Sequence, residues 1–552
     1  MQLASIPTRA LLGIEAPEVT VEVHLSPGLP SFAIVGMPET AVKESKERVR
    51  SAILNTGLEF PSQRITVNLA PADLPKAGGR YDLAIALAIL VASDQMDSFG
   101  DALNGIEMLG ELALDGGLRP VPGVVQALLA ARSRGRAIVV PSANRDEVEL
   151  VDYSLALAIA DLGDLFQIAA ALAVEGATLF DVFEEKRATA EPKLRQRETN
   201  TPIFAPVRGQ ARALRALEVA AAGGHNVLML GPPGSGKTLL ATTLSKLLPP
   251  MNRKEVLEVA AIRSVASGAL ALGSARERPM RAPHHSATMP SLVGGGAAAV
   301  PGDITLAHRG VLFLDELTEF KPSVLNALRE PLEEGKITIS RARYRVEYPA
   351  NFQLVAAMNP CPCGFASDPH KLCRCTPDRV RNYLSKLSGP LLDRFDMIIE
   401  VPALSHAELL AVKQEGRCDE SQQENRKENR QEKRQEDEQK DEQKDEQNIE
   451  QKEWQRRREK IAACRSLQAR RQNRLNSEIE SSQLEAACNL DSDKQATLVK
   501  LLESLKVSAR GAHRILRMAR TLADLEEAVE VQHRHFLEAA SYRRCKTMEE
   551  LL

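Results

Sequence analysis

The chain has no long apolar run, no strong excess of charge of either sign and no apolar signal segment near its N-terminus. No stretch approaches the roughly 18 consecutive apolar residues that a membrane-spanning helix needs, so we expect no membrane association. The formal net charge of −3 gives the protein no general attraction for nucleic acid, so any contact with DNA must be local. Without a signal segment, the eight cysteines indicate reduced thiols in the cytoplasm rather than paired disulfides.

What is present is a long chain of ordinary composition. Its 552 residues are 43% hydrophobic and 26% charged, as in soluble globular proteins, and length alone predicts roughly three or four domains. Changes in pattern divide the chain into an α+β domain (1–182), a charged linker (183–205), an α/β core (206–404), a charged low-complexity insertion (405–456) and a helical domain (457–552).

The insertion contains the run Asp419–Asn448, which has no apolar residue, twelve acidic residues and seven basic ones. Such a segment cannot bury a core. We expect a solvated tether or a single exposed helix with i,i+4 charge pairs, rather than a dedicated binding tail.

The strongest motif is a glycine-rich turn between a strand and a helix. Its residues are Gly231, Pro232, Pro233, Gly234, Ser235, Gly236, Lys237 and Thr238. They match the pattern G-x-x-x-x-G-K-[ST], in which backbone N–H groups surround phosphates, the lysine reaches the β and γ phosphates, and the threonine holds Mg²⁺. The apolar run 227–230 predicts a buried parallel strand, and 238–248 has helical spacing. We therefore expect a nucleotide and Mg²⁺ at this turn.

Two more apolar runs supply polar side chains for the same site. The run 311–314 predicts a buried strand that ends in Asp315 and Glu316. We expect Asp315 to hold Mg²⁺, directly or through water, and Glu316 to orient the water that attacks the γ-phosphate. The next strand, 352–358, ends at Asn359, for which the alternative interpretation is a simple Asn-Pro turn.

Cys361, Cys363, Cys373 and Cys375 form two close thiol pairs in a loop rich in Gly, Pro and Asp. Four thiolates suit tetrahedral Zn²⁺, although C-x-C is tighter than the commoner C-x₂-C spacing. We expect zinc, with four free thiols as the alternative and His370 as a spare ligand. The pair His284 and His285 is interpreted as packing or support of the nucleotide site, not as a metal site.

Residues 336–348 predict a β-hairpin with a basic tip. Its tip carries Arg341, Arg343, Tyr344 and Arg345. These side chains can follow a phosphate backbone and stack on a base, so we expect contact with DNA here. The alternative is an exposed basic turn without a ligand.

Further segments resemble the magnesium-chelatase-like AAA+ family, and most closely its bacterial ComM- and YifB-type branch of competence-related proteins. The diagnostic segments are 281–285, 292–296, 301–305, 306–310 and 359–364. The resemblance covers nearly the whole chain. It implies an α/β fold with an AAA+ P-loop core, preceded by an S5-like domain shared with Lon peptidases and followed by a helical lid. Segments 76–82 and 110–121 carry the resemblance to the S5-like domain.

The resemblance also implies roles for single residues. Asn359 matches the residue that senses the γ-phosphate. Arg394 matches the arginine that reaches the nucleotide of a neighbouring subunit, with a surface ion pair to Asp393 as the alternative. Arg510 is the best match to the second sensor residue, and Arg514 is the next best match.

By resemblance, the protein is an ATP- and Mg²⁺-dependent motor that works as a homo-hexamer, with the 336–348 hairpin lining its pore. The resemblance further implies that it performs helicase-type branch migration on single-stranded or branched DNA during transformation or recombination, alongside recombination proteins. The alternatives are a magnesium-chelatase motor subunit and another protein-remodelling ATPase. We expect no peptidase activity, because Arg80 or its neighbours and Val125 stand near the positions of the Lon serine and lysine, so no activated nucleophile is present.

Overall fold

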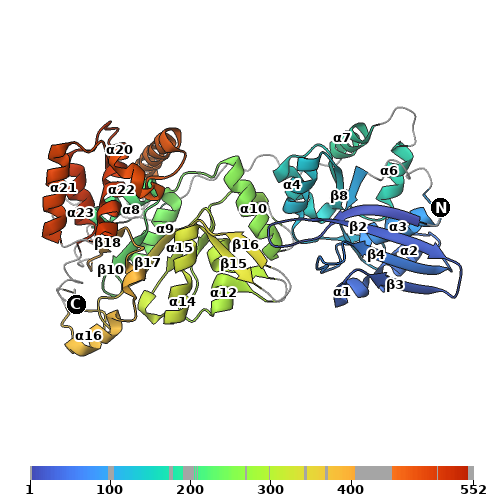
Figure 1. Ribbon diagram of the computed structural model, residues 1–552, viewed down its shortest axis with the longest axis horizontal. Coiled ribbons are helices and arrows are strands. Elements are labelled where there is room, and N and C mark those ends of the chain that lie inside the picture. Colours follow the sequence, from blue (N-terminus) through green and yellow to red (C-terminus); the bar gives the residue numbers. More distant parts are fainter. Residues whose placement is uncertain are drawn as a thin grey trace, which may run out of the picture.

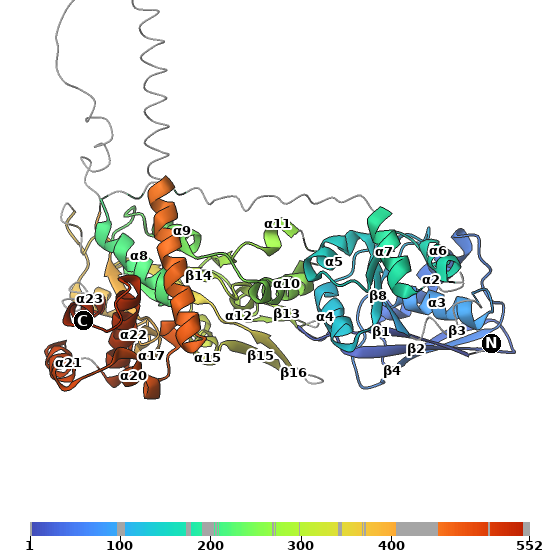
Figure 2. The ribbon, with the colours of Figure 1, turned by 90° about the horizontal axis from the view of Figure 1, so that it is seen from above.

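The computed structural model describes residues 3–96, 105–172, 178–189, 204, 207, 209–267, 270, 272–296, 299–340, 345–366, 368, 371–403, 451–505 and 508–544. Three folded parts follow one another along the long axis of the molecule: an N-terminal part in blue to cyan, a central part in green to yellow and a C-terminal helical part in orange to red (Figures 1 and 2). No helix among these described residues is both long enough and apolar enough to cross a membrane.

The N-terminal part contains two main sheets. The first has the order β1-β2-β4-β3, and the second is a parallel sheet of order β5-β8-β9. The strands are β1 (Leu3–Arg9), β2 (Glu18–Ser26), β3 (Ser31–Val35), β4 (Arg64–Ala70), β5 (Ile106–Met108), β6 (Glu111–Leu112), β7 (Leu118–Arg119), β8 (Ala137–Pro141) and β9 (Ala156–Ile159). The helices are α1 (Thr40–Lys43), α2 (Ser45–Asn55), α3 (Asp82–Ala92), α4 (Val124–Arg134), α5 (Arg145–Val151), α6 (Asp164–Leu172) and α7 (Leu179–Thr189).

Helix α3 forms the centre of this part. The sequence predicts a buried helix over 81–92 because apolar residues surround it on all sides. This prediction is confirmed, since every residue of α3 except Val91 is buried and the helix packs on β1 and β2. Arg80, just before α3, and Val125 in α4 are buried as well.

The central part is built on a parallel sheet of order β11-β14-β17-β10-β18. Its strands are β11 (Met280–Arg281), β14 (Val311–Leu314), β17 (Gln353–Met358), β10 (Val227–Leu230) and β18 (Met397–Glu400). Every residue of β10, β14 and β17 is buried, as expected for apolar strands covered on both faces. The order places β17 between β14 and β10, so the three strand ends that carry the predicted polar residues are neighbours.

The remaining elements of the central part surround this sheet. They are α8 (Ala211–Gly223), α9 (Lys237–Leu247), α10 (Arg253–Ser267), α11 (Leu272–Ala275), α12 (Met289–Val293), β12 (Gly294–Gly295), β13 (Val300–Pro301), α13 (Asp303–Leu306), α14 (Pro322–Ala327), α15 (Arg329–Glu334), α16 (Pro377–Leu384) and α17 (Gly389–Leu392). The predicted hairpin is confirmed as the antiparallel pair β15 (Lys336–Ser340) and β16 (Arg345–Pro349). Its tip, with Arg341 and Arg343, lies outside the described residues.

The C-terminal part is helical. It comprises a helix over 451–472 and α20 (Leu484–Cys488), α21 (Ser492–Leu505), α22 (Ala509–Leu525) and α23 (His533–Ser541). The first helix is already formed at residue 451, within the range assigned to the insertion, and Trp454 stacks on Phe204 with ring centroids 4.7 Å apart. The acidic run 419–448 lies outside the described residues. The buried side chains of this part form one hydrophobic core with α8 and β10.

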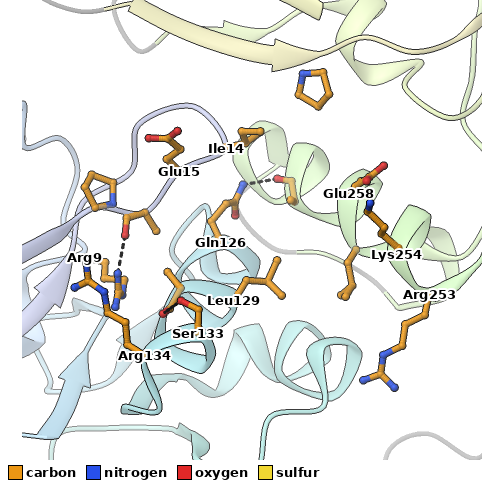
Figure 3. Close-up of a pocket in the computed structure, with 16 residues that line it drawn as sticks. Arg9, Ile14, Glu15, Gln126, Leu129, Ser133, Arg134, Arg253, Lys254 and Glu258 are labelled. Carbon is orange, nitrogen blue, oxygen red and sulfur yellow. Dashed lines mark hydrogen bonds between the residues drawn. The ribbon is translucent and has the colours of Figure 1, made fainter. Parts of the chain in front are cut away.

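The N-terminal and central parts share a second core between α4 and α10. Gln126 Nε2 on α4 donates to the carbonyl of Ala261 on α10 at 2.6 Å. Beside this contact lies a cavity of about 930 Å³, with Leu129 and Leu257 in its walls. Figure 3 shows Arg134 on the N-terminal side of this cavity, and Arg253 and Lys254 on the side of α10. Among the predicted site residues that the structure describes, none lines the cavity.

Glu147 lies at this junction and should make its stability depend on pH. Burial raises the pKa of the Glu147 carboxyl from 4.5 to about 7, against the lowering effect of hydrogen bonds from Ser264 on α10 and from Asn144. Because the folded pKa is the higher one, stability falls as pH rises from about 4.5 to 7, by on the order of 2 to 3 kcal/mol. Glu147→Gln removes the buried charge, so we expect a higher melting temperature than the natural chain at pH 8.

The two proteins should melt alike near pH 5, where the carboxyl in the folded chain is already neutral. Glu149→Gln, on the exposed face of the same helix, is the matched control and should change little at either pH. An equal gain from both substitutions at pH 8 would contradict the assignment of the effect to Glu147.

Candidate functional site

The glycine-rich turn joins the carboxyl end of β10 to the first residue of α9. Gly234 and Gly236 have φ angles of 79° and 84°, in the left-handed region that glycine adopts without strain. These conformations let the turn reverse direction and present backbone N–H groups at a helix N-terminus, which is a favourable place for phosphate. The local geometry therefore agrees with the phosphate-binding pattern in the sequence.

Lys237 bends back over this turn. Its Nζ donates to the carbonyls of Gly231 and Pro232 at 2.9 and 2.8 Å, and it lies 3.3 Å from Asn359 Oδ1. Burial lowers the pKa of Lys237, while the nearby carboxylates of Asp315 and Glu316 raise it. The ammonium group thus stands over the space that the β and γ phosphates occupy in such loops.

The structure brings Thr238 and Asp315 together, as expected for a shared ion. Thr238 Oγ1 donates to Asp315 Oδ2 at 3.0 Å, and the backbone N–H of Glu316 donates to Asp315 Oδ1 at 2.9 Å. A hydroxyl and a carboxylate side by side fit a Mg²⁺ ion that keeps several waters and also binds phosphate. These two residues are the ones that would hold the ion.

Glu316 is exposed and held by a residue that the sequence did not single out as its partner. Its φ is 50°, an uncommon value for a residue other than glycine, and its Oε2 lies 3.1 Å from His285 Nδ1. The sequence leaves His285 between packing and support of the site, and the structure favours support. The signal that could have found it is the His-His pair in segment 281–285.

Asn359 lies at the end of β17, between the ends of β14 and β10. Its contact with Lys237 joins it to the phosphate turn. The chain bends at Pro360, and the hydrogen-bonded turn comes only after it, where the backbone N–H of Gly364 donates to the carbonyl of Cys361 at 2.9 Å.

Arg394, Arg510 and Arg514 do not lie at the phosphate turn. They line a second cavity, of about 1,100 Å³, together with Asn226, Gly310 and Gln353, which precede or begin the strands β10, β14 and β17. The cavity therefore lies at the amino ends of the sheet strands, whereas Lys237, Asp315 and Asn359 lie at the carboxyl ends. Within one chain, these arginines and the phosphate turn therefore lie at opposite ends of the strands.

Arg394 is nearly buried, with 7% of its surface exposed. It forms an ion pair with Glu333 and donates from Nη1 to the carbonyl of Pro390 at 2.9 Å. Its observed partner is thus Glu333 and not Asp393, the partner considered from the sequence. Burial lowers the pKa of Arg394, and the positive charges of Arg329, Arg510 and Arg514 lower it further.

Helix α22 begins at Ala509, and Ser508 Oγ accepts from the backbone N–H of Gly511 at 3.3 Å. Arg514 is fixed by an ion pair to Asp396 at 2.5 Å and by a hydrogen bond to the carbonyl of Arg394 at 3.2 Å. Arg510, one turn earlier, is exposed. Of the two arginines, Arg510 is therefore the one whose side chain faces solvent.

The structure describes both strands of the basic hairpin, including Arg345 of the predicted DNA-binding residues. Arg345 is exposed, and its Nη2 lies 3.2 Å from Glu347 Oε1 on the same strand. The end of β16 next to the tip lies against the N-terminal part, because Val346 contacts the turn at Gly13.

The four cysteines of the loop after β17 come together. Their sulfur atoms all lie within 4.8 Å of one another, and among the residues with described positions they form the one group of three or more His, Cys, Asp and Glu side chains placed closely enough to share a metal ion. His370 is not among the described residues.

Comparisons with known proteins agree with this geometry. Three family descriptions match successive parts of the chain: "Subunit ChlI of Mg-chelatase" over residues 21–144, "Magnesium chelatase, subunit ChlI" over 203–409 and "Magnesium chelatase, subunit ChlI C-terminal" over 451–543. A magnesium-chelatase 67 kDa subunit of Heliobacterium mobile is 29% identical over 195 residues, which cover 30% of this chain and 29% of that subunit.

Two relatives match almost from end to end. The chain is 42% identical over 545 residues to the uncharacterized protein YifB of Escherichia coli (strain K12), covering 98% of this chain and 97% of YifB. It is 43% identical over 543 residues to the competence protein ComM of Haemophilus influenzae, covering 98% of both. The chain therefore belongs to the family of YifB and ComM, within the magnesium-chelatase-like AAA+ proteins.

Proposed function

We propose that the protein is a cytoplasmic ATPase that works as a ring of identical subunits, most simply a hexamer. The observation that carries this proposal is the separation of two half-sites: a phosphate turn at the carboxyl ends of the strands and three arginines at the amino ends. Stacking subunits head to tail brings these two surfaces together, and such contacts form a ring when the rotation between neighbours closes on itself. In this arrangement the S5-like N-terminal part and the helical lid lie at either side of the AAA+ core.

In the proposed reaction, Lys237 and the turn from Gly231 to Gly236 bind the phosphates of ATP. Thr238 and Asp315 hold Mg²⁺, which neutralises charge on the phosphates when bound. Glu316 orients and polarises the attacking water, with His285 fixing its carboxylate, and Asn359 senses the γ-phosphate.

Arg394 and Arg510 act on the nucleotide of the neighbouring subunit. An arginine supplied from a neighbour stabilises the negative charge that spreads over the transferring phosphoryl group. Because Arg394 is held by Glu333 and Pro390, its guanidinium is already ordered before a neighbour arrives. Arg514, which is fixed on Asp396, is a positioning residue for this surface.

We further propose that the work of the motor is done on DNA, as helicase-type branch migration on single-stranded or branched substrates during transformation or recombination. The name of ComM as a competence protein and the basic composition of the 341–345 tip support this. Recombination proteins would act alongside it.

A strand-exchange assay on a branched DNA tests the proposal. The protein should separate or exchange labelled strands only with Mg²⁺ and ATP, and Lys237→Ala should abolish both ATP hydrolysis and exchange. ATPase activity that no DNA stimulates, with no strand exchange, would exclude the DNA motor. It would favour a magnesium-chelatase-type motor subunit or another remodelling ATPase, the alternative that the three chelatase family matches support.

The hairpin makes a separate prediction. Replacing Arg341, Arg343 and Arg345 together by alanine should weaken DNA binding and reduce its dependence on salt, because each lost phosphate contact removes about one released counterion. Basal ATP hydrolysis should stay unchanged, since these positions are remote in sequence from the phosphate turn. The measurement is DNA affinity at several salt concentrations. Replacement of Arg379 and Arg381 on α16 is the control, and equal DNA affinity of the triple variant and the natural chain would refute the role of the hairpin.

A further inference from the structure

The cysteine loop after β17 has the dimensions of a metal site. The Sγ atoms of Cys361 and Cys363 lie 3.3 Å apart, those of Cys361 and Cys373 3.7 Å apart, and those of Cys363 and Cys373 3.6 Å apart. A zinc ion bound by four thiolates at about 2.3 Å holds its sulfurs about 3.8 Å apart. The thiols are thus already near the positions that tetrahedral coordination requires.

The surroundings of these thiols show why a metal would matter for the loop. Within residues 359–376, the described positions include no helix and no strand. Cys361 is fully buried in the hydrophobic core beside β17, whereas Cys363, Cys373 and Cys375 are only half-buried at the edge of that core. Apolar packing therefore anchors one end of the loop, and the sulfur cluster joins its two halves.

We propose that Cys361, Cys363, Cys373 and Cys375 bind one Zn²⁺, and that this ion fixes the turn carrying Asn359 against the phosphate turn. Four thiolates in a tetrahedral set, with no histidine or open position, are typical of a structural zinc site. The ion closes the loop by joining residues that are 10 to 14 positions apart in the sequence.

The contact with the nucleotide site is direct. Asn359 and Cys361 are separated by one proline, so the first zinc ligand lies only two residues after the polar residue that follows β17. Gly364, within the same loop, lies so close to the phosphate turn that a Cβ atom on it would stand 2.6 Å from Pro233 Cδ and 3.9 Å from Asn359 Cγ. A loop held by zinc therefore stays packed against Pro233 and limits the movement of the Asn359 side chain.

Metal content is the first test, and it does not depend on the ATPase proposed above. Protein made without a histidine tag and purified without chelators should contain about one zinc per chain by elemental analysis. Cys363→Ser should lose most of it, whereas Cys375→His, which keeps a zinc ligand, should retain it. Cys488→Ser in the C-terminal part, where the thiol contacts the carbonyl of Leu516, is the matched control and should leave zinc unchanged.

Substoichiometric zinc in the natural chain would overturn the proposal. Iron in place of zinc, or two disulfides in protein kept under reducing conditions, would overturn it as well. If Cys363→Ser does not fold, the metal can be released from the natural protein with a mercurial reagent and counted with a chromogenic chelator, where release of less than one zinc for four blocked thiols contradicts the site.

The second test concerns the coupling to Asn359, and it rests on the ATPase function. In a folded variant that has lost zinc, affinity for a non-hydrolysable ATP analogue should change less than threefold, because Lys237 is intact. Hydrolysis at saturating ATP should fall at least tenfold, and Cys375→His should recover it. Equal hydrolysis with and without zinc would leave a metal site that does not position Asn359, and so would refute the coupling while the metal analysis stands.

Discussion

Replacing Arg394 by alanine is expected to lower ATP hydrolysis by about a thousandfold while leaving ATP binding unchanged. The reason is geometric: Arg394 lies at the amino ends of the strands, and the phosphate turn lies at their carboxyl ends. It can contribute to hydrolysis only at the nucleotide of a neighbour, and it contributes nothing to binding in its own subunit. Steady-state hydrolysis and analogue binding on the assembled variant measure the two quantities separately.

Three further variants make this result specific. Arg394→Lys should remain strongly impaired, because an ammonium group cannot reproduce the planar, forked contacts of guanidinium. Arg381→Ala removes an exposed arginine that pairs with Asp378 on α16 and should hydrolyse ATP normally. Glu333→Gln removes the ion pair that orders Arg394 and should therefore reduce hydrolysis, but by less than Arg394→Ala. An Arg394→Ala assembly that turns over at the natural rate would exclude the role in the neighbouring site.

Mixing inactive variants tests action between subunits directly. Lys237→Ala lacks the phosphate contact, and Arg394→Ala lacks the arginine, so each should be inactive alone. In a ring with random neighbours, about a quarter of the interfaces pair an intact phosphate turn with an intact Arg394. The mixture should therefore regain activity, whereas a mixture that stays inactive despite exchange of subunits would contradict a shared site.

Glu316→Gln should give the second large effect, a fall in hydrolysis of about 10² to 10⁴ with ATP still bound. The substitution keeps the size of the side chain but removes the negative charge that polarises water. It leaves Lys237, Thr238 and Asp315 intact, so the variant should hold ATP without turnover. Single-turnover hydrolysis and retention of labelled ATP on the isolated protein measure this.

Glu319, three residues after Glu316, provides the control. Glu319→Gln makes the same change at a residue whose carboxylate lies 3.8 Å from Lys386 and should leave hydrolysis unchanged. His285→Ala should reduce hydrolysis less than Glu316→Gln, since it removes only the partner that fixes the carboxylate. Normal turnover by Glu316→Gln would require another residue to activate water.

Much of the nucleotide site could be predicted because Asp315 and Asn359 directly follow strands that are almost entirely apolar, and Lys237 follows such a strand after a recognisable glycine-rich turn. Parallel strands deliver the residues after their carboxyl ends to one edge of a sheet, so β10, β14 and β17 bring Lys237, Asp315 and Asn359 together once their order is known. The β15–β16 hairpin and helix α3 could be predicted equally well, because the hydrophobic pattern of each lies within its own residues. In each case the signal lies within one or two neighbouring elements.

Contacts between distant segments could not be predicted in this way. The pairing of Glu316 with His285, of Arg394 with Glu333 and of Glu147 with Ser264 depends on how separate elements pack. The stacking of Trp454 on Phe204 extends the folded helix into residues that composition alone had joined to the charged insertion. Side-chain charge and periodicity carry no information about these partners, because the partners lie outside any local window.

Strand β10 is only four residues long, which is about 13 Å of extended chain. Its carboxyl end continues into the phosphate turn, and its amino end is tied through Asn226 to the carboxylate of Asp396 and the carbonyl of Arg394. In the proposed ring, this one short strand would therefore join the phosphate turn that holds one nucleotide to the arginines that serve the next.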